Sequence, residues 1–210
     1  MAHLDLHEQE QVDKLKYFWR DWGKYIVGGI AILAIGYALN SGYSYYKQTK
    51  AKDAVVVYND LTTQITQAND KEIYADADKL ISQYSSAEYA PMGALITAKY
   101  AFDKKDYVSA EKYLIWTKDN SEDKSLSSLA VLRLASVYVD QQKFDKAREL
   151  LRTKHDLAFD GLFYEARGDT YIAMGDLNKA RDAYKEGLQK AANDPTTQQS
   201  IQMKLSVIGG

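Results

Sequence analysis

The strongest constraint on this chain is a run of 22 residues, 25–46, that contains no charged side chain. A helix needs about 20 predominantly apolar residues to cross the ~30 Å hydrocarbon core of a bilayer, so this run is long enough. Aromatic residues gather on both of its flanks, as is typical of the two membrane–water interfaces. We therefore predict a transmembrane helix at 25–46, with a tail, 1–24, before it and a larger domain, 47–210, after it.

A cleaved signal peptide is the alternative interpretation of this run. Its apolar centre, 25–39, is short, and the small polar residues Asn40, Ser41 and Gly42 follow it. However, the preceding tail is long and contains five acidic residues, whereas a signal peptide normally begins with a few basic ones. No good small-residue cleavage site follows the run. These features favour an uncleaved anchor.

The orientation of the anchor follows from a small charge bias. Four basic residues flank the run on the tail side and three flank it on the other side. Long domains cross membranes largely regardless of charge, so the short tail dominates the positive-inside rule. We expect the N-terminus in the cytoplasm and the domain 47–210 on the opposite side of the membrane.

The tail and the span also carry candidate anchor residues. Two tryptophans of the tail lie on one helical stripe that basic residues surround, which suits an interface helix, with docking on a membrane partner as the alternative. Small residues within the span form a face of the kind that packs against other membrane helices. The predicted anchor residues are Trp19, Trp22, Gly28, Gly29, Ala34 and Ala38.

The remaining composition offers little for catalysis. With 27 basic and 29 acidic residues, the net charge of −2 argues against a nucleic-acid-binding protein. The sequence has no cysteine, no glycine-rich phosphate loop and no HExxH motif. His155 lies next to Asp156 in a predicted loop, where we expect a solvated histidine rather than part of a catalytic triad. We predict no catalytic residue, no cofactor and no metal.

The domain after the span repeats itself at intervals of 33, 37 and 33 residues. Each copy has an aromatic or large residue, an alanine three positions later, and a large apolar residue four positions after that. A mostly small residue stands nine positions before each copy. The alanines of the four copies are Ala77, Ala110, Ala147 and Ala180. This register is typical of the tetratricopeptide repeat, a pair of antiparallel helices in about 34 residues.

We therefore predict an all-α fold, in which a single N-terminal transmembrane helix precedes a tetratricopeptide-repeat-like solenoid. An ordinary helical bundle with accidental periodicity is the alternative. The first repeat, from about Ala54 to Ser85, is degenerate, and the long interval predicts an extended polar loop around Thr117–Leu126. Asp194 and Pro195 predict the start of a C-terminal helix that caps the open end of the stack.

The first helix of each repeat should line a concave face that binds an extended or partly folded polypeptide. An apolar centre with a polar edge suits such a ligand. The alternative is that the same side chains belong to the core and are covered by the capping helix. The candidate binding residues are Leu95, Lys99, Phe102, Leu132, Ser136, Val139, Glu165 and Asp169.

Taken together, the tail EQEQVDKLKYFWRDWGKY at 8–25, the uncleaved span and the degenerate repeats resemble the YfgM-like ancillary subunits of the SecYEG translocon. This resemblance covers essentially the whole chain, and the tail is its most specific part. It implies an inner-membrane protein with a periplasmic repeat domain. It also implies association with SecYEG and the periplasmic chaperone PpiD, and a role in passing newly translocated polypeptides to chaperones.

Three functions compete at this point. The first is a non-enzymatic scaffold or chaperone accessory at the translocon. The second is an envelope assembly scaffold, in division or cell-wall synthesis, that uses the repeats as a protein-binding module. The third is an enzyme or an enzyme subunit, which the absence of catalytic motifs disfavours.

Overall fold

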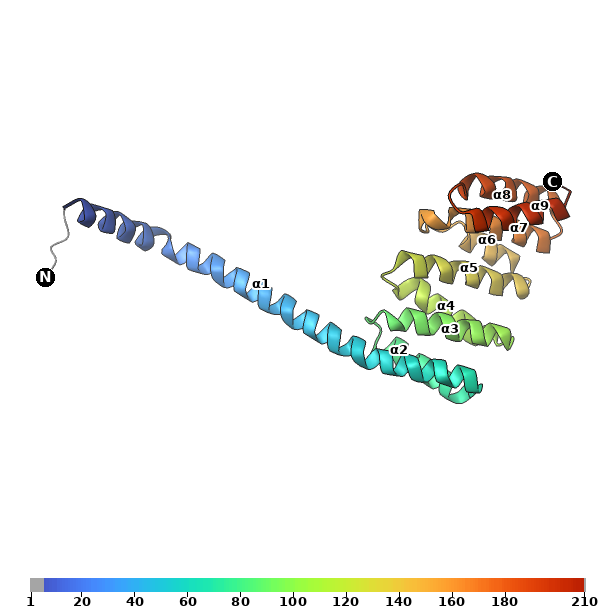
Figure 1. The fold of residues 1–210 in the computed structure, drawn as a ribbon, viewed down its shortest axis with the longest axis horizontal. Coiled ribbons are helices and arrows are strands. Elements are labelled where there is room, and N and C mark those ends of the chain that lie inside the picture. The colour runs from blue at the N-terminus through green and yellow to red at the C-terminus, as the bar shows by residue number, and fades with distance from the viewer. Residues whose placement is uncertain (1–5, 210) are drawn as a thin grey trace. The chain divides into compact units, whose positions relative to one another are not determined.

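The computed structural model describes residues 6–209, and all the regular structure in this part of the chain is helical (Figure 1). The predicted all-α fold is therefore confirmed. The helices are α1 (Leu6–Gln67), α2 (Asp70–Gln83), α3 (Tyr89–Asp103), α4 (Tyr107–Asn120), α5 (Lys124–Asp140), α6 (Phe144–Leu150), α7 (Asp160–Ala173), α8 (Leu177–Lys190) and α9 (Pro195–Val207), with a short 3-10 helix, η1 (Leu157–Phe159), before α7.

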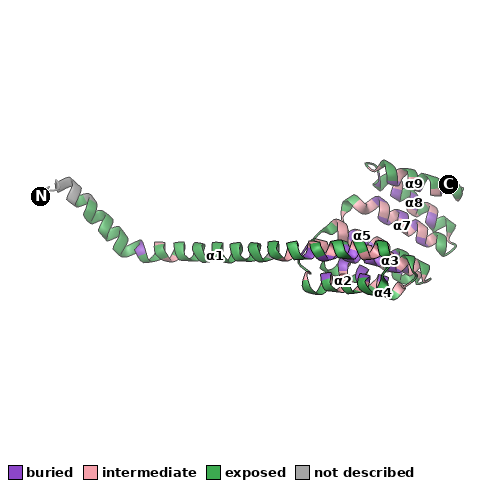
Figure 2. Cartoon of the chain, turned by 60° about the horizontal axis from the view of Figure 1, so that its bottom comes forward, coloured by how far each residue is buried: buried purple, intermediate pink, exposed green. Residues whose placement is uncertain are grey.

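The chain divides into two compact units between Thr49 and Lys50. The described part of the first unit is a segment of α1, and nearly all its residues are exposed (Figure 2). Among the described helices, α1 is the one long and apolar enough to cross a membrane. Its large exposed apolar side chains, such as Ile32 and Leu33, are what lipid rather than water would solvate.

The second unit stacks its helices in chain order, as the repeat register predicts (Figure 1). The alanine of every repeat lies at the helix–helix contact and is fully buried: Ala77, Ala110, Ala147 and Ala180. The last part of α1 supplies the first helix of the degenerate repeat, because Ala54, Val57 and Leu61 share a core with α2 and α3. The tetratricopeptide-like solenoid is confirmed.

The turn inside each of the four repeats has the same backbone geometry. The residues two positions before the second helices all have positive φ angles: Ala68 (54°), Lys105 (62°), Gln142 (58°) and Gly175 (80°). Only one of the four is glycine, although the left-handed region favours glycine. In each turn the amide of this residue donates to the carbonyl three residues earlier, so backbone hydrogen bonds hold the turn whatever the side chain.

The expected long polar loop around Thr117–Leu126 is wrong. Helix α4 continues to Asn120 and α5 begins at Lys124, so only three residues connect them. The Asp123 side chain caps α5 by accepting hydrogen bonds from the amides of Ser125 and Leu126. The extra residues of this repeat instead lengthen α5, which has 17 residues where α7 has 14.

The predicted capping helix is confirmed as α9. Asp194 accepts a hydrogen bond from the Thr197 amide at 3.1 Å, and Pro195 occupies the first turn. Ile201 and Leu205 are buried against Ala180 and Tyr184 of α8. This last helix covers the apolar edge that an open repeat stack would expose.

Candidate functional site

A groove between α3 and α5 is the most developed candidate for a polypeptide-binding site. It forms a cavity of about 310 Å³, and its lining comes mainly from the first helices of two successive repeats. The lining residues are Ala98, Lys99, Phe102 and Asp103 of α3, Leu114 of α4, and Arg133, Ser136 and Val137 of α5. We refer to these residues as the α3–α5 groove.

The helical spacing of these residues explains why they meet. Lys99, Phe102 and Asp103 recur at three- and four-residue intervals, so they lie on one face of α3. Ser136 follows Arg133 by three residues on α5 in the same way. Ala98 is small and buried, which lets the two helices approach and leaves space above it. The groove is thus a product of the repeat pattern rather than of a specialised loop.

The floor of the groove is apolar and its rim is charged. The Phe102 ring is half-buried and meets the Tyr107 ring edge-on, with 6.0 Å between ring centroids. On the rim, the Lys99 ammonium pairs with the Asp103 carboxylate at 2.6 Å. Both partners are well exposed, so this ion pair contributes little to stability and can exchange for contacts with a ligand.

Arg133 is the charged residue closest to the floor. Its Nη1 donates a hydrogen bond to the Leu95 carbonyl oxygen at 3.2 Å. Burial lowers the pKa of its guanidinium from the ordinary value, because the charged form loses water. Arg133 has further N–H donors besides this one, and it is part of the groove lining.

The structure separates the eight predicted binding residues into groups. Lys99, Phe102 and Ser136 come together in the α3–α5 groove. Leu95 is only 4% exposed and belongs to the core. Leu132 and Val139 are half-buried and pack against the cluster around Phe163, outside the groove lining.

The remaining two predicted residues, Glu165 and Asp169, are engaged by the capping helix. Ser200 donates to the Glu165 carboxylate at 2.6 Å, and the Lys204 ammonium lies 2.7 Å from both acids. Burial alone would lower the pKa of Lys204, but the hydrogen bonds from Lys204 to Asp169 and Glu165 outweigh it and raise that pKa. At this end of the stack α9 occupies the positions that a ligand would need.

The predicted anchor residues lie on the exposed surface of α1. Trp19 and Trp22 are half or more exposed, and Trp22 contacts Tyr25 with ring centroids 6.1 Å apart. A Cβ added at Gly28 or Gly29 would meet no heavy atom within 4 Å. The helix surface at Gly28 and Gly29 therefore has room for lipid or for another membrane helix.

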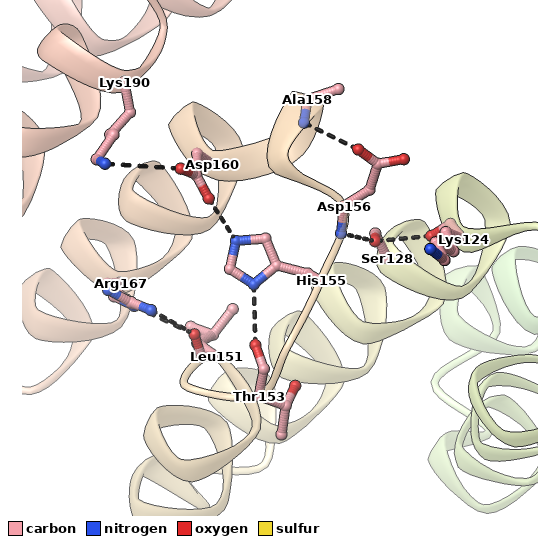
Figure 3. A network of polar contacts seen from close by, with 10 residues as sticks. All are labelled: Lys124, Ser128, Leu151, Thr153, His155, Asp156, Ala158, Asp160, Arg167 and Lys190. Carbon is pink, nitrogen blue, oxygen red and sulfur yellow. Dashed lines mark hydrogen bonds and ion pairs between the residues drawn. The ribbon is translucent and has the colours of Figure 1, made fainter.

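The expectation of a solvated His155 is wrong. Its side chain is only 13% exposed and stacks on the Phe163 ring, with 3.6 Å between centroids. One ring nitrogen, Nδ1, lies 2.9 Å from the Thr153 carbonyl, and the other, Nε2, lies 2.8 Å from Asp160 (Figure 3). The nearby Ser128 hydroxyl donates to the Lys124 carbonyl and accepts from the Asp156 amide, so it makes no contact with the histidine. The network ties the α6–α7 connection to α5 and α7.

Sequence reasoning missed Arg133 and Asp103 as groove residues. Arg133 carried a usable signal, because it is the one basic residue between Ser125 and Val139 in an otherwise apolar and small-residue helix. Asp103 carried none, since an exposed acid at a helix end is common.

Comparison with known proteins gives two findings. A family model described as "Tetratricopeptide repeat-like domain" matches residues 16–210. A Neisseria gonorrhoeae protein named "Ancillary SecYEG translocon subunit" is 33% identical over 208 residues, which cover 97% of each chain. Proteins of the same name from Haemophilus influenzae and Escherichia coli are each 26% identical and cover 96% and 95% of this chain, and 97% and 96% of their own. No solved structure matches the chain significantly.

Proposed function

Because this chain belongs to the family of ancillary SecYEG translocon subunits, we propose that it is a non-enzymatic scaffold that receives newly translocated polypeptides and passes them to chaperones. The translocon-associated role follows from the family. The transfer of polypeptides is our inference from the α3–α5 groove, which offers an apolar floor and exchangeable polar groups at its rim.

The anchor and the family together make the chain a single-pass membrane-associated protein. We further propose that it lies in the inner membrane with its tail in the cytoplasm and its repeat domain in the periplasm. The positive-inside bias of the tail supports this orientation. In that position the groove would meet polypeptides as they leave the channel, and PpiD is the partner chaperone that the family resemblance suggests.

The groove carries this proposal because its geometry suits extended polypeptide without demanding a particular sequence. Phe102 supplies one aromatic anchor of the kind that dominates protein–protein binding energies. Arg133 supplies donors for carbonyl groups, which every polypeptide has. An envelope assembly scaffold would use the same repeats, but with division or cell-wall proteins as partners.

Affinity purification distinguishes the two scaffolds. The full-length protein is purified from membranes in mild detergent, and the partners are identified by mass spectrometry. A variant that lacks residues 1–46 is the matched control. We expect the full chain to recover SecYEG subunits and a periplasmic chaperone, and the truncated chain to lose the SecYEG subunits because the anchor is missing.

Two outcomes would count against the proposal. Recovery of division or cell-wall proteins without SecYEG would support the envelope scaffold. Equal recovery of SecYEG by the truncated chain would show that recruitment does not depend on the tail and span.

A further inference from the structure

A second cavity, of about 300 Å³, lies between α6, α7 and α8, and shares no residue with the α3–α5 groove. We refer to it as the α6–α8 pocket. Its lining is rich in charged and tyrosine side chains: Arg148, Arg152, Tyr164, Arg167, Tyr171, Lys179, Asp182, Ala183 and Glu186.

The pocket lies beside α6, which is unusually short. Helix α6 has 7 residues, whereas the corresponding second helices α4 and α8 have 14 each. At 1.5 Å per residue, α6 therefore stops about 10 Å before a full-length second helix would. The chain instead leaves the stack at Leu151, where the next residues form the connection held by His155 (Figure 3).

The cations of the pocket have spare hydrogen-bonding capacity. Arg148 pairs through Nη1 with the fully exposed Asp145 at 3.1 Å, but its Nε is buried and has no hydrogen-bond partner among the described residues. The Arg152 side chain makes no hydrogen bond or ion pair within residues 6–209. The buried Nε is not open to a ligand, but the Arg148 side chain as a whole is 33% exposed, so the outer part of its guanidinium can donate to a ligand acceptor.

Tyrosine rings hold two of these arginines in place. The Arg167 guanidinium lies over the Tyr164 ring at 4.5 Å, and its Nε and Nη2 both bond the Leu151 carbonyl oxygen. The Arg148 guanidinium lies over the Tyr171 ring at 5.9 Å. Side chains that are already ordered lose less entropy when a ligand binds, so these cations are preorganised.

The α8 side of the pocket carries two unpaired carboxylates. Asp182 and Glu186 are exposed, and neither makes an ion pair in the described part of the chain, although arginines line the same cavity. The pocket thus presents arginines from α6, its end and α7, and two unpaired carboxylates from α8, where the one lining cation, Lys179, is already paired with Asp176 at 2.6 Å. A simple anion would be attracted by the arginines and repelled by Asp182 and Glu186.

We propose that the α6–α8 pocket binds a polypeptide segment that carries acidic residues next to a basic one. The carboxylates of the segment would pair with Arg148 and Arg152, while its cation would face Asp182 and Glu186. Arginine is suited to this role because its planar fork binds carboxylates through two parallel hydrogen bonds. The inference stands apart from the proposed function, since it uses none of the residues of the α3–α5 groove.

The test uses the full-length protein in detergent and two dye-labelled probes. One is a serine–glycine peptide that contains two glutamates followed by a lysine, and the other has glutamines in place of the glutamates. Fluorescence anisotropy should show about tenfold tighter binding of the glutamate peptide, which is the expected effect of one charge-assisted contact. Arg152→Glu should abolish this preference.

Arg152 is exposed and makes no side-chain hydrogen bond or ion pair among the described residues, so its replacement should leave folding intact, as circular dichroism can check. Lys71→Glu on α2 is the matched control, because it makes the same charge change away from the pocket. Arg152→Gln should give an intermediate loss. Equal binding of both peptides, or an unchanged preference in Arg152→Glu, would overturn the proposal. An equal loss of the preference for the glutamate peptide in Lys71→Glu would also overturn it.

Discussion

Replacing Gly168 by alanine is expected to destabilise the repeat domain by about 1–3 kcal/mol, the usual cost of overpacking a filled core. An added Cβ would lie 2.2 Å from Cε1 and 2.4 Å from Cδ1 of Tyr184. That ring cannot move aside cheaply, because it is 2% exposed and its hydroxyl donates to Asp169 at 2.8 Å. Burial and the neighbouring Asp169 carboxylate also raise the pKa of Tyr184, so the hydroxyl remains a donor at neutral pH.

The measurement is thermal unfolding of the full-length protein in detergent, followed by circular dichroism. For a domain of this size about 2 kcal/mol corresponds to a decrease in Tm of roughly 4–8 °C. Gly42→Ala on α1 is the control, because an added Cβ there meets nothing within 4 Å. Alanine is the better helix former, so this control should be neutral or slightly stabilising.

A second variant tests whether the contact with the Tyr184 ring causes the loss of stability. In a Tyr184→Leu background the ring is gone, and Gly168→Ala should lose most of its cost. The difference between the two backgrounds measures the contact itself. An equal cost in both backgrounds would mean that the close approach of α7 and α8 is not what requires glycine here.

Phe102→Glu is expected to weaken the binding of unfolded polypeptide by tenfold or more, since loss of a central aromatic anchor commonly has this effect. The substitution places a charge on the apolar floor of the α3–α5 groove. A fluorescent polypeptide that has been reduced and alkylated, so that it stays unfolded, is the probe. Binding is measured by anisotropy with the full-length protein in detergent.

Two further variants show whether a loss of binding comes from the groove itself. Ser136→Glu adds the same charge at an exposed groove position, so it should weaken binding without disturbing the core. Val108→Glu adds it on α4, where Val108 is 81% exposed and lies outside the groove lining, and binding should be unchanged. Equal binding by Phe102→Glu, Ser136→Glu and Val108→Glu would place the polypeptide elsewhere on the protein.

The repeat register was predictable from sequence because it depends on local steric requirements. The four alanines that recur in the sequence are fully buried where helices meet, since no larger side chain fits there. The capping helix was predictable for a similar reason: Asp194 and Pro195 satisfy the first turn without help from the rest of the fold.

The early end of α6 was not predictable in this way. The segment after Leu151 is held outside the stack by tertiary contacts, namely the stacking of His155 on Phe163 and the hydrogen bond from the Asp156 amide to Ser128. Ser128 is 28 residues away in the sequence, so no local pattern reveals the contact. The α6–α8 pocket beside this connection was not predictable either, because its lining comes from three helices and the residues after α6.

The candidate groove was only partly predictable. Helical spacing brought Lys99, Phe102 and Ser136 together, but it could not show that α9 would engage Glu165 and Asp169. The difference between an open groove and a covered one depends on where the last helix packs, which the repeat pattern does not specify.

Site-specific photo-crosslinking during translocation tests the central claim most directly. A benzophenone side chain is introduced at position 102 in the full-length protein, and at position 108 as the control, while a secretory polypeptide is stalled in the channel. If the α3–α5 groove receives newly translocated polypeptide, position 102 should crosslink to the stalled chain and position 108 should not. Crosslinks from position 108 alone, or from neither position while the stalled chain remains in the channel, would contradict the account.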